Sequence, residues 1–98
     1  MPLTSQDLAA IDVAIHAVPS VKGMSALHAY ERPDGRTVII TRVGLSPLLK
    51  LSEIVYVIGE VELAVRRAND QVAAVFVEPD IAADAATPTE TIVIRALD

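Results

Sequence analysis

Acidic residues that could bind a cation lie close together after an apolar run near the end of the chain. Glu78, Asp80 and Asp84 follow the apolar residues 72–77. Carboxylate oxygens are hard ligands, which suit magnesium, calcium or manganese better than zinc. The segment lacks the regular ligand spacing and the glycine of a calcium-binding loop, which favours ordinary solvated acids. Glu78 and Asp80 are kept as candidate ligands for a divalent cation, and no other cofactor is expected.

The histidines His16 and His28 are the other side chains that could bind a metal or transfer a proton. His28 precedes Glu31 by three residues. On a strand, residues at this spacing point to opposite faces, which disfavours a shared site and favours a structural histidine. His28 is kept as the third candidate metal ligand. His16 follows Asp12 at helical spacing, which predicts a local ion pair.

No combination of residues is typical of catalysis. Ser46, Ser52 and Thr41 have no histidine or lysine base at a recognisable spacing. The glycines do not form a phosphate-binding loop. We therefore do not expect an enzyme.

Charge and composition exclude further classes of protein. A formal net charge of -5 argues against nucleic acid as a partner, because binding there depends on clustered Lys and Arg. The adjacent cations Arg66 and Arg67 end an expected helix, where they face the helix dipole favourably. The chain has no cysteine, no signal peptide and no apolar run near the roughly 20 residues that cross a bilayer. We expect a soluble, cytoplasmic chain that does not insert into a membrane.

Two helices and a hairpin are predicted in the first two thirds of the chain. Thr4 followed by Asp7 predicts the start of a helix over residues 5–18. The turn at residues 33–35 joins residues 21–31 to the β-branched residues 37–41 as antiparallel strands. Gly44, Ser46 and Pro47 are expected to break the second strand. A second helix capped by Ser52 continues to residue 68, because its apolar residues form one helical stripe.

The rest of the chain predicts a third strand over residues 71–77, a linker over 80–90 and an added strand over 91–97. We predict one α+β domain over residues 1–98, in which both helices cover one face of a mixed sheet. Its core is expected to be aliphatic, since 3% of the residues are aromatic. Val75 and Phe76 are expected in a central strand, so aspartate at either position should unfold the core.

Five short segments resemble the cytoplasmic C-terminal domain of the cation diffusion facilitator family. They are VPSVKG at 18–23, TVII at 37–40, LSE at 51–53 with VE at 61–62, and VFVEP at 75–79. The resemblance covers residues 8–79, most of the predicted α-β-β-α-β core at 4–79. It implies a ferredoxin-like or metallochaperone-like domain that forms a homodimer and regulates cation/proton exchange by a transmembrane domain of the same transporter. That transmembrane domain is absent from these 98 residues.

The histidines by which members of this family bind zinc have no counterparts here. An ungapped placement puts their positions at Ser25, Thr41, Val55 and Phe76, which leaves Glu78 as an oxygen ligand. One carboxylate cannot make the four-ligand site that zinc prefers. The resemblance therefore implies little or no metal binding at the family's usual site.

Two functions remain open from the sequence. The first is the dimerisation and regulatory domain of a divalent-cation efflux transporter. The second is a free-standing ferredoxin-like module that binds a small molecule or another protein, because a shared fold does not determine function.

Overall fold

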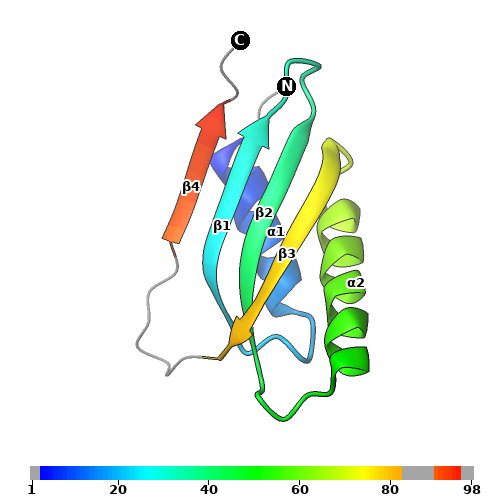
Figure 1. Ribbon diagram of the computed structural model, residues 1–98. Coiled ribbons are helices and arrows are strands. Elements are labelled where there is room, and N and C mark those ends of the chain that lie inside the picture. The colour runs from blue at the N-terminus through cyan, green and yellow to red at the C-terminus, as the bar shows by residue number, and fades with distance from the viewer. Residues whose placement is uncertain (1–2, 83–89, 96–98) are drawn as a thin grey trace.

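The elements follow one another in the predicted order, helix, strand, strand, helix, strand and added strand (Figure 1). The computed structural model describes residues 3–82 and 90–95. Its elements are α1 (Ser5–His16), β1 (Gly23–Glu31), β2 (Thr37–Leu45), α2 (Leu51–Ala68), β3 (Val72–Ile81) and β4 (Glu90–Arg95). The predicted α+β class is confirmed.

The strands form one mixed sheet in the order β3-β2-β1-β4. The hairpin strands β1 and β2 are antiparallel, as predicted, whereas β3 is parallel to β2 and β4 is parallel to β1. Helix α2 provides the long connection that parallel neighbours such as β2 and β3 require. The sequence did not predict how the added strand pairs, and its last two predicted residues lie outside the described part of the chain.

One aliphatic cluster joins both helices to one face of the sheet. It contains Ile11 and Ile15 of α1, Val61 and Val65 of α2, and Ile39 of β2, all with 0% exposure. The buried hydrophobic residues are all aliphatic or methionine, which confirms the predicted aliphatic core. Burial of this cluster is the main stabilising contribution in a chain of this size.

In the first turn of each helix, an acidic side chain accepts a hydrogen bond from the backbone N–H of the residue that precedes the helix. In α1, the Thr4 N–H donates to Asp7 at 2.8 Å, and the Asp7 N–H donates to the Thr4 hydroxyl at 3.1 Å. This capping box confirms the predicted start. In α2, the Lys50 N–H donates to Glu53 at 2.8 Å, so the N-cap is Lys50 and the predicted cap at Ser52 is wrong.

The second and third strands are longer than predicted. β2 continues through Gly44 to Leu45 instead of breaking at Gly44. A Cβ at Gly44 would lie 3.0 Å from the Ala82 Cα atom, so the glycine permits a close backbone approach rather than ending the strand. β3 passes through Pro79 and Asp80 to Ile81, beyond the predicted ends of the third strand at residue 77 and of the core at residue 79. Proline is tolerated because β3 lies at an edge of the sheet.

The predicted bounds of the linker and the predicted central position of the third strand are both wrong. Residues 80 and 81 belong to β3 and Glu90 begins β4, while residues 83–89 lie outside the described chain. Because β3 is an edge strand, the expectation that Phe76 supports the core is wrong: Phe76 is 60% exposed, whereas its neighbour Val75 is 7% exposed. Successive residues on a strand point to opposite faces.

Candidate functional site

The sheet has a second face on which neither helix packs, here called the open face. The strand registers place side chains of β1, β2 and β3 on it in rows. The three rows are Tyr30, Val38 and Ala74; His28, Ile40 and Phe76; and Ala26, Arg42 and Glu78. Most of these residues are partly buried, and Phe76, Arg42 and Glu78 are exposed. The open face therefore combines an apolar strip with one pair of opposite charges.

Glu78, the first candidate metal ligand, forms an ion pair with Arg42 on the neighbouring strand. The Arg42 Nη2 atom donates to the Glu78 Oε2 atom at 3.1 Å. A pair exposed to this degree contributes about 0–1 kcal/mol to stability. Its consequence for ligand binding is greater, because a cation that approached Glu78 would meet the positive charge of Arg42.

The other two candidate ligands do not form a group with Glu78 that could hold a metal ion, within the described residues. The Asp80 Oδ1 atom accepts a hydrogen bond from the Ile81 N–H at 2.8 Å. His28 is on β1, with β2 between it and β3. Two strand spacings put the backbones of β1 and β3 about 10 Å apart. Within residues 3–82 and 90–95, no three His, Cys, Asp or Glu side chains form a group that could hold a metal ion.

The ring of His28 lies on the open face, and its centroid is 6.4 Å from that of Tyr30. Its Nε2 atom is buried and makes no hydrogen bond in the described structure. The strand register puts Glu31 on the opposite face from His28, as its spacing predicted. Asp84 lies outside the described residues.

The four positions taken from the family resemblance do not share one surface. Ser25 lies at the irregularity in the pairing of β1 with β2, and Val55 is on α2. The Thr41 hydroxyl is buried and donates to the Ala26 carbonyl oxygen at 3.0 Å. Phe76 lies on the open face, where its row contains Ile40 rather than Thr41. The ungapped placement therefore missed Arg42, which the alternation of buried and exposed residues in β2 could have identified.

Two of the other charged residues that the sequence singled out, His16 and Arg66, have local partners. The His16 Nδ1 atom lies 2.7 Å from Asp12 Oδ1, which confirms the predicted ion pair. Arg66 and Arg67 lie in the last turn of α2, as predicted, and the Arg66 Nη1 atom donates to the Ala73 carbonyl oxygen at 3.5 Å.

Further exposed apolar side chains occur at one end of the sheet, where the β2–α2 loop and the last residues of β3 lie near each other (Figure 1). The Ala82 N–H donates to the Leu45 carbonyl oxygen at 2.9 Å and joins the two strand ends. The side chains exposed here are Leu48 (89%), Leu51 (76%), Val55 (61%) and Ile81 (66%). We call these four residues the end patch. Groups of exposed large apolar side chains often mark interaction sites.

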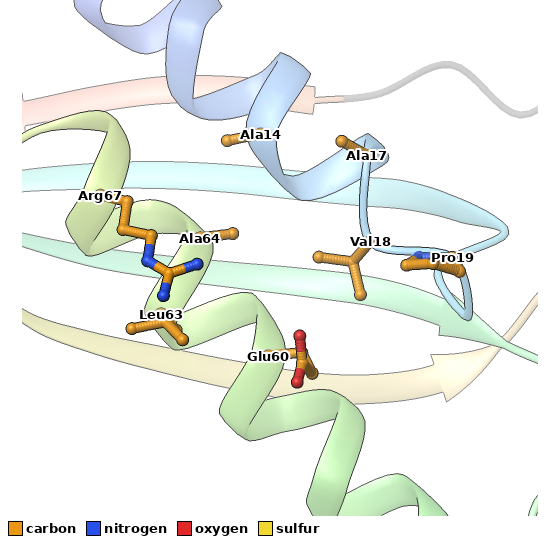
Figure 2. A pocket seen from close by; sticks show the side chains of 8 residues that line it. All are labelled: Ala14, Ala17, Val18, Pro19, Glu60, Leu63, Ala64 and Arg67. Atoms are coloured by element: carbon orange, nitrogen blue, oxygen red, sulfur yellow. The ribbon is translucent and has the colours of Figure 1, made fainter.

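A groove of 160 Å³ separates the C-terminal half of α1 from the middle of α2 (Figure 2). It is lined by apolar residues of both helices and of the turn after α1, together with the charged residues Glu60 and Arg67 of α2. Small-molecule sites usually measure about 300–1,000 Å³, so the groove is small for such a ligand. Of the helices that the structure describes, neither is long and apolar enough to span a bilayer.

Solved structures of MamM C-terminal domains have the same fold as this chain. A copper form of the MamM CTD matches with a TM-score of 0.82 and 17% sequence identity, covering 96% of this chain and 90% of that chain. A manganese form of a MamM CTD variant matches with a TM-score of 0.77 and 17% identity, covering 92% and 99%. A zinc form of another variant gives 0.76 and 19%, covering 86% and 93%.

Neither protein-family models nor curated proteins match the chain. At 17–19% identity, the structural matches establish the fold rather than the function. This chain shares the fold of the MamM CTD, in which two helices lie on one face of a mixed sheet. This confirms the fold that the sequence resemblance implied.

Proposed function

We propose that the chain is the cytoplasmic dimerisation and regulatory domain of a divalent-cation efflux transporter of the cation diffusion facilitator family. The observation that carries this proposal is the MamM CTD fold over 96% of the chain with a TM-score of 0.82. The short segments that resemble the family support it independently. Cation/proton antiport belongs to a transmembrane domain, and the chain itself is not an enzyme.

The end patch is the surface that we assign to homodimerisation. Leu51 and Val55 are four residues apart on α2 and so lie on one side of the helix. Leu48 of the loop and Ile81 of β3 are exposed apolar side chains at the same end of the sheet. A second copy related by two-fold symmetry would cover all four side chains, and such isologous contacts are common among homo-oligomers.

The domain binds little or no metal at the family's usual site. The guanidinium of Arg42 supplies a fixed positive charge beside Glu78, at 3.1 Å. A dimer that already contains this cation does not need a metal ion to offset the charge of Glu78. Weak binding of a divalent cation by Glu78, Asp80 or His28 is the remaining possibility for this face.

The second candidate function is a free-standing ferredoxin-like module that binds a small molecule or another protein. The open face favours it, because its apolar strip carries Phe76 at 60% exposure. Removing Phe76 would weaken such binding without changing a dimer formed by the end patch.

Light scattering on metal-stripped protein tests the proposed function. We expect a mass of a dimer or more, which does not change when zinc, manganese or magnesium is added. Leu51→Asp should abolish the association through the end patch and lower the mass, whereas Phe76→Asp should not. A monomeric wild-type protein would contradict the dimerisation domain, and a dimer that forms only with metal would contradict the metal-independent assembly.

A further inference from the structure

The side of α1 that faces away from the sheet is unusually apolar. α1 buries Leu8, Ile11 and Ile15 against the sheet. Its opposite side carries alanines and Val13, which is 70% exposed. A surface helix normally has charged and polar residues on its outer side, and a helix that is apolar all round is normally buried. The chain alone leaves this side of α1 uncovered.

The adjoining side of α2 combines apolar residues with two opposite charges. Leu63 is 43% exposed, and Ala64 beside it is small enough for a second helix to approach closely. Figure 2 shows Glu60 and Arg67 on the same side of α2, which faces the groove beside α1. Within the described residues, Arg67 makes no hydrogen bond or ion pair. Hydrogen bonding with Glu60, followed by the charge of that carboxylate, raises the pKa of Tyr56 one helical turn before it.

The positions of the two charges have a symmetry of their own. Glu60 and Arg67 lie at equal distances along α2 from a point between Leu63 and Ala64. Seven residues separate them, which is about 10 Å at 1.5 Å per residue, and this spacing keeps them on one side of the helix. A two-fold axis through that point would run α2 antiparallel to α2 of a second copy. It would bring each Glu60 to the Arg67 of the other copy.

We propose that the helix layer docks on the helix layer of a second copy in this antiparallel arrangement. Two Glu60–Arg67 pairs fix the register, and Leu63 and Val13 supply apolar contact. Charge complementarity argues for a second copy, since this surface complements itself. The 160 Å³ of the groove accommodates side chains better than a drug-sized ligand.

This contact is separate from the end patch, so each copy would have two isologous surfaces. Together they would join dimers into tetramers or larger assemblies, whereas either alone would give a dimer. The inference does not depend on the proposed transport function.

Charge reversal followed by charge exchange tests the proposal. Sedimentation velocity would be measured over a range of concentrations, in the wild type and in the Leu51→Asp background, where the end patch is disrupted. Glu60→Arg places two like charges opposite each other at both pairs and should weaken the helix-layer association by about tenfold or more. The double variant Glu60→Arg with Arg67→Glu should restore it.

Two control variants isolate the effect of the charge pairs. Glu62→Arg makes the same change in net charge on α2 outside the residues that line the groove, and it should leave the association unchanged. Tyr56→Phe removes the phenol hydroxyl whose pKa Glu60 raises but keeps both charges, and it should also have no effect.

The proposal would be overturned if Glu60→Arg left the association unchanged, or if the exchanged pair failed to restore it. Absence of any association in the Leu51→Asp background, together with a wild type that remains dimeric at all concentrations, would also overturn it. That last result would leave the proposed dimer through the end patch intact. The two proposals can therefore fail separately.

Discussion

The two faces of the sheet contain similar apolar residues but hold them in different surroundings. On β2, Ile39 has 0% exposure beneath the helices, whereas the next residue, Ile40, lies on the open face. On β3, Val75 is 7% exposed and Phe76 is 60% exposed. Residue type therefore does not distinguish a residue that stabilises the fold from one available to a partner. The covering helices make that distinction.

The strongest way to break this comparison is to place a charge on each face of β3. Val75→Asp would leave an unpaired carboxylate beneath the helices and should cost about 3 kcal/mol or more, enough to unfold much of a small domain. Phe76→Asp should remain folded, with a loss below about 1 kcal/mol. Urea denaturation followed by circular dichroism measures both. An unfolded Phe76→Asp variant would contradict its place on the open face.

Truncation of neighbouring isoleucines sharpens the comparison without adding a charge. Ile39→Ala should lower the free energy of unfolding by about 2–5 kcal/mol, because it leaves a cavity in the core. Ile40→Ala removes the same atoms from a partly exposed position and should cost clearly less. The difference between the two denaturation midpoints is the test, and equal losses would show that the open face is covered.

The ion pair on the open face provides a smaller effect. Arg42→Ala removes the cation 3.1 Å from Glu78 and should change the free energy of unfolding by about 1 kcal/mol or less. It also leaves Glu78 without its positive neighbour, so manganese binding, measured by calorimetry on metal-stripped protein, should increase. Stronger manganese binding by the wild type than by Arg42→Ala would contradict this role. Arg36→Ala, which removes an arginine elsewhere on the chain, is a control for net charge.

The smallest expected effect is on the pKa of Tyr56, which lies on α2 in the helix layer. The hydrogen bond to Glu60, followed by the negative charge of that residue, raises the pKa of Tyr56 above 10.0. Both effects favour the neutral phenol in the folded state. Their contribution to the stability of the fold is therefore present below the ordinary pKa of tyrosine, and it is lost as the pH rises through the pKa of Tyr56 in the folded protein.

Absorbance at alkaline pH measures this pKa directly in a Tyr30→Phe background, where Tyr56 is the remaining tyrosine. Glu60→Gln should lower the pKa of Tyr56, while Glu62→Gln should leave it unchanged. An unchanged pKa in Glu60→Gln would show that the two side chains are not in contact.

Most of the fold could be predicted because its signals are local. The capping residues Thr4 and Asp7, the turn at 33–35 and the helical stripe of α2 each depend on residues close in sequence. The errors occurred where distant segments meet. Gly44 stays within a strand because Ala82 approaches it, and Pro79 is accepted because β3 has a neighbour on one side.

The candidate site could be predicted less well, because its residues come from different strands. Glu78 was recognised as a possible ligand, but its partner Arg42 lies 36 residues earlier. Nothing near Glu78 in the sequence indicates that pairing. The end patch was missed for a similar reason, since Leu51 and Val55 have the residue types of a buried helix and become exposed only through the orientation of α2.

The sequence alone determined the order of the elements, the aliphatic core and the resemblance to a family of domains, because propensity, capping and periodicity act over short distances. Only the tertiary structure decided which strand lies at the edge, which face of the sheet is open and which charges meet. Those features depend on strand order and register, which follow from the packing of all elements together.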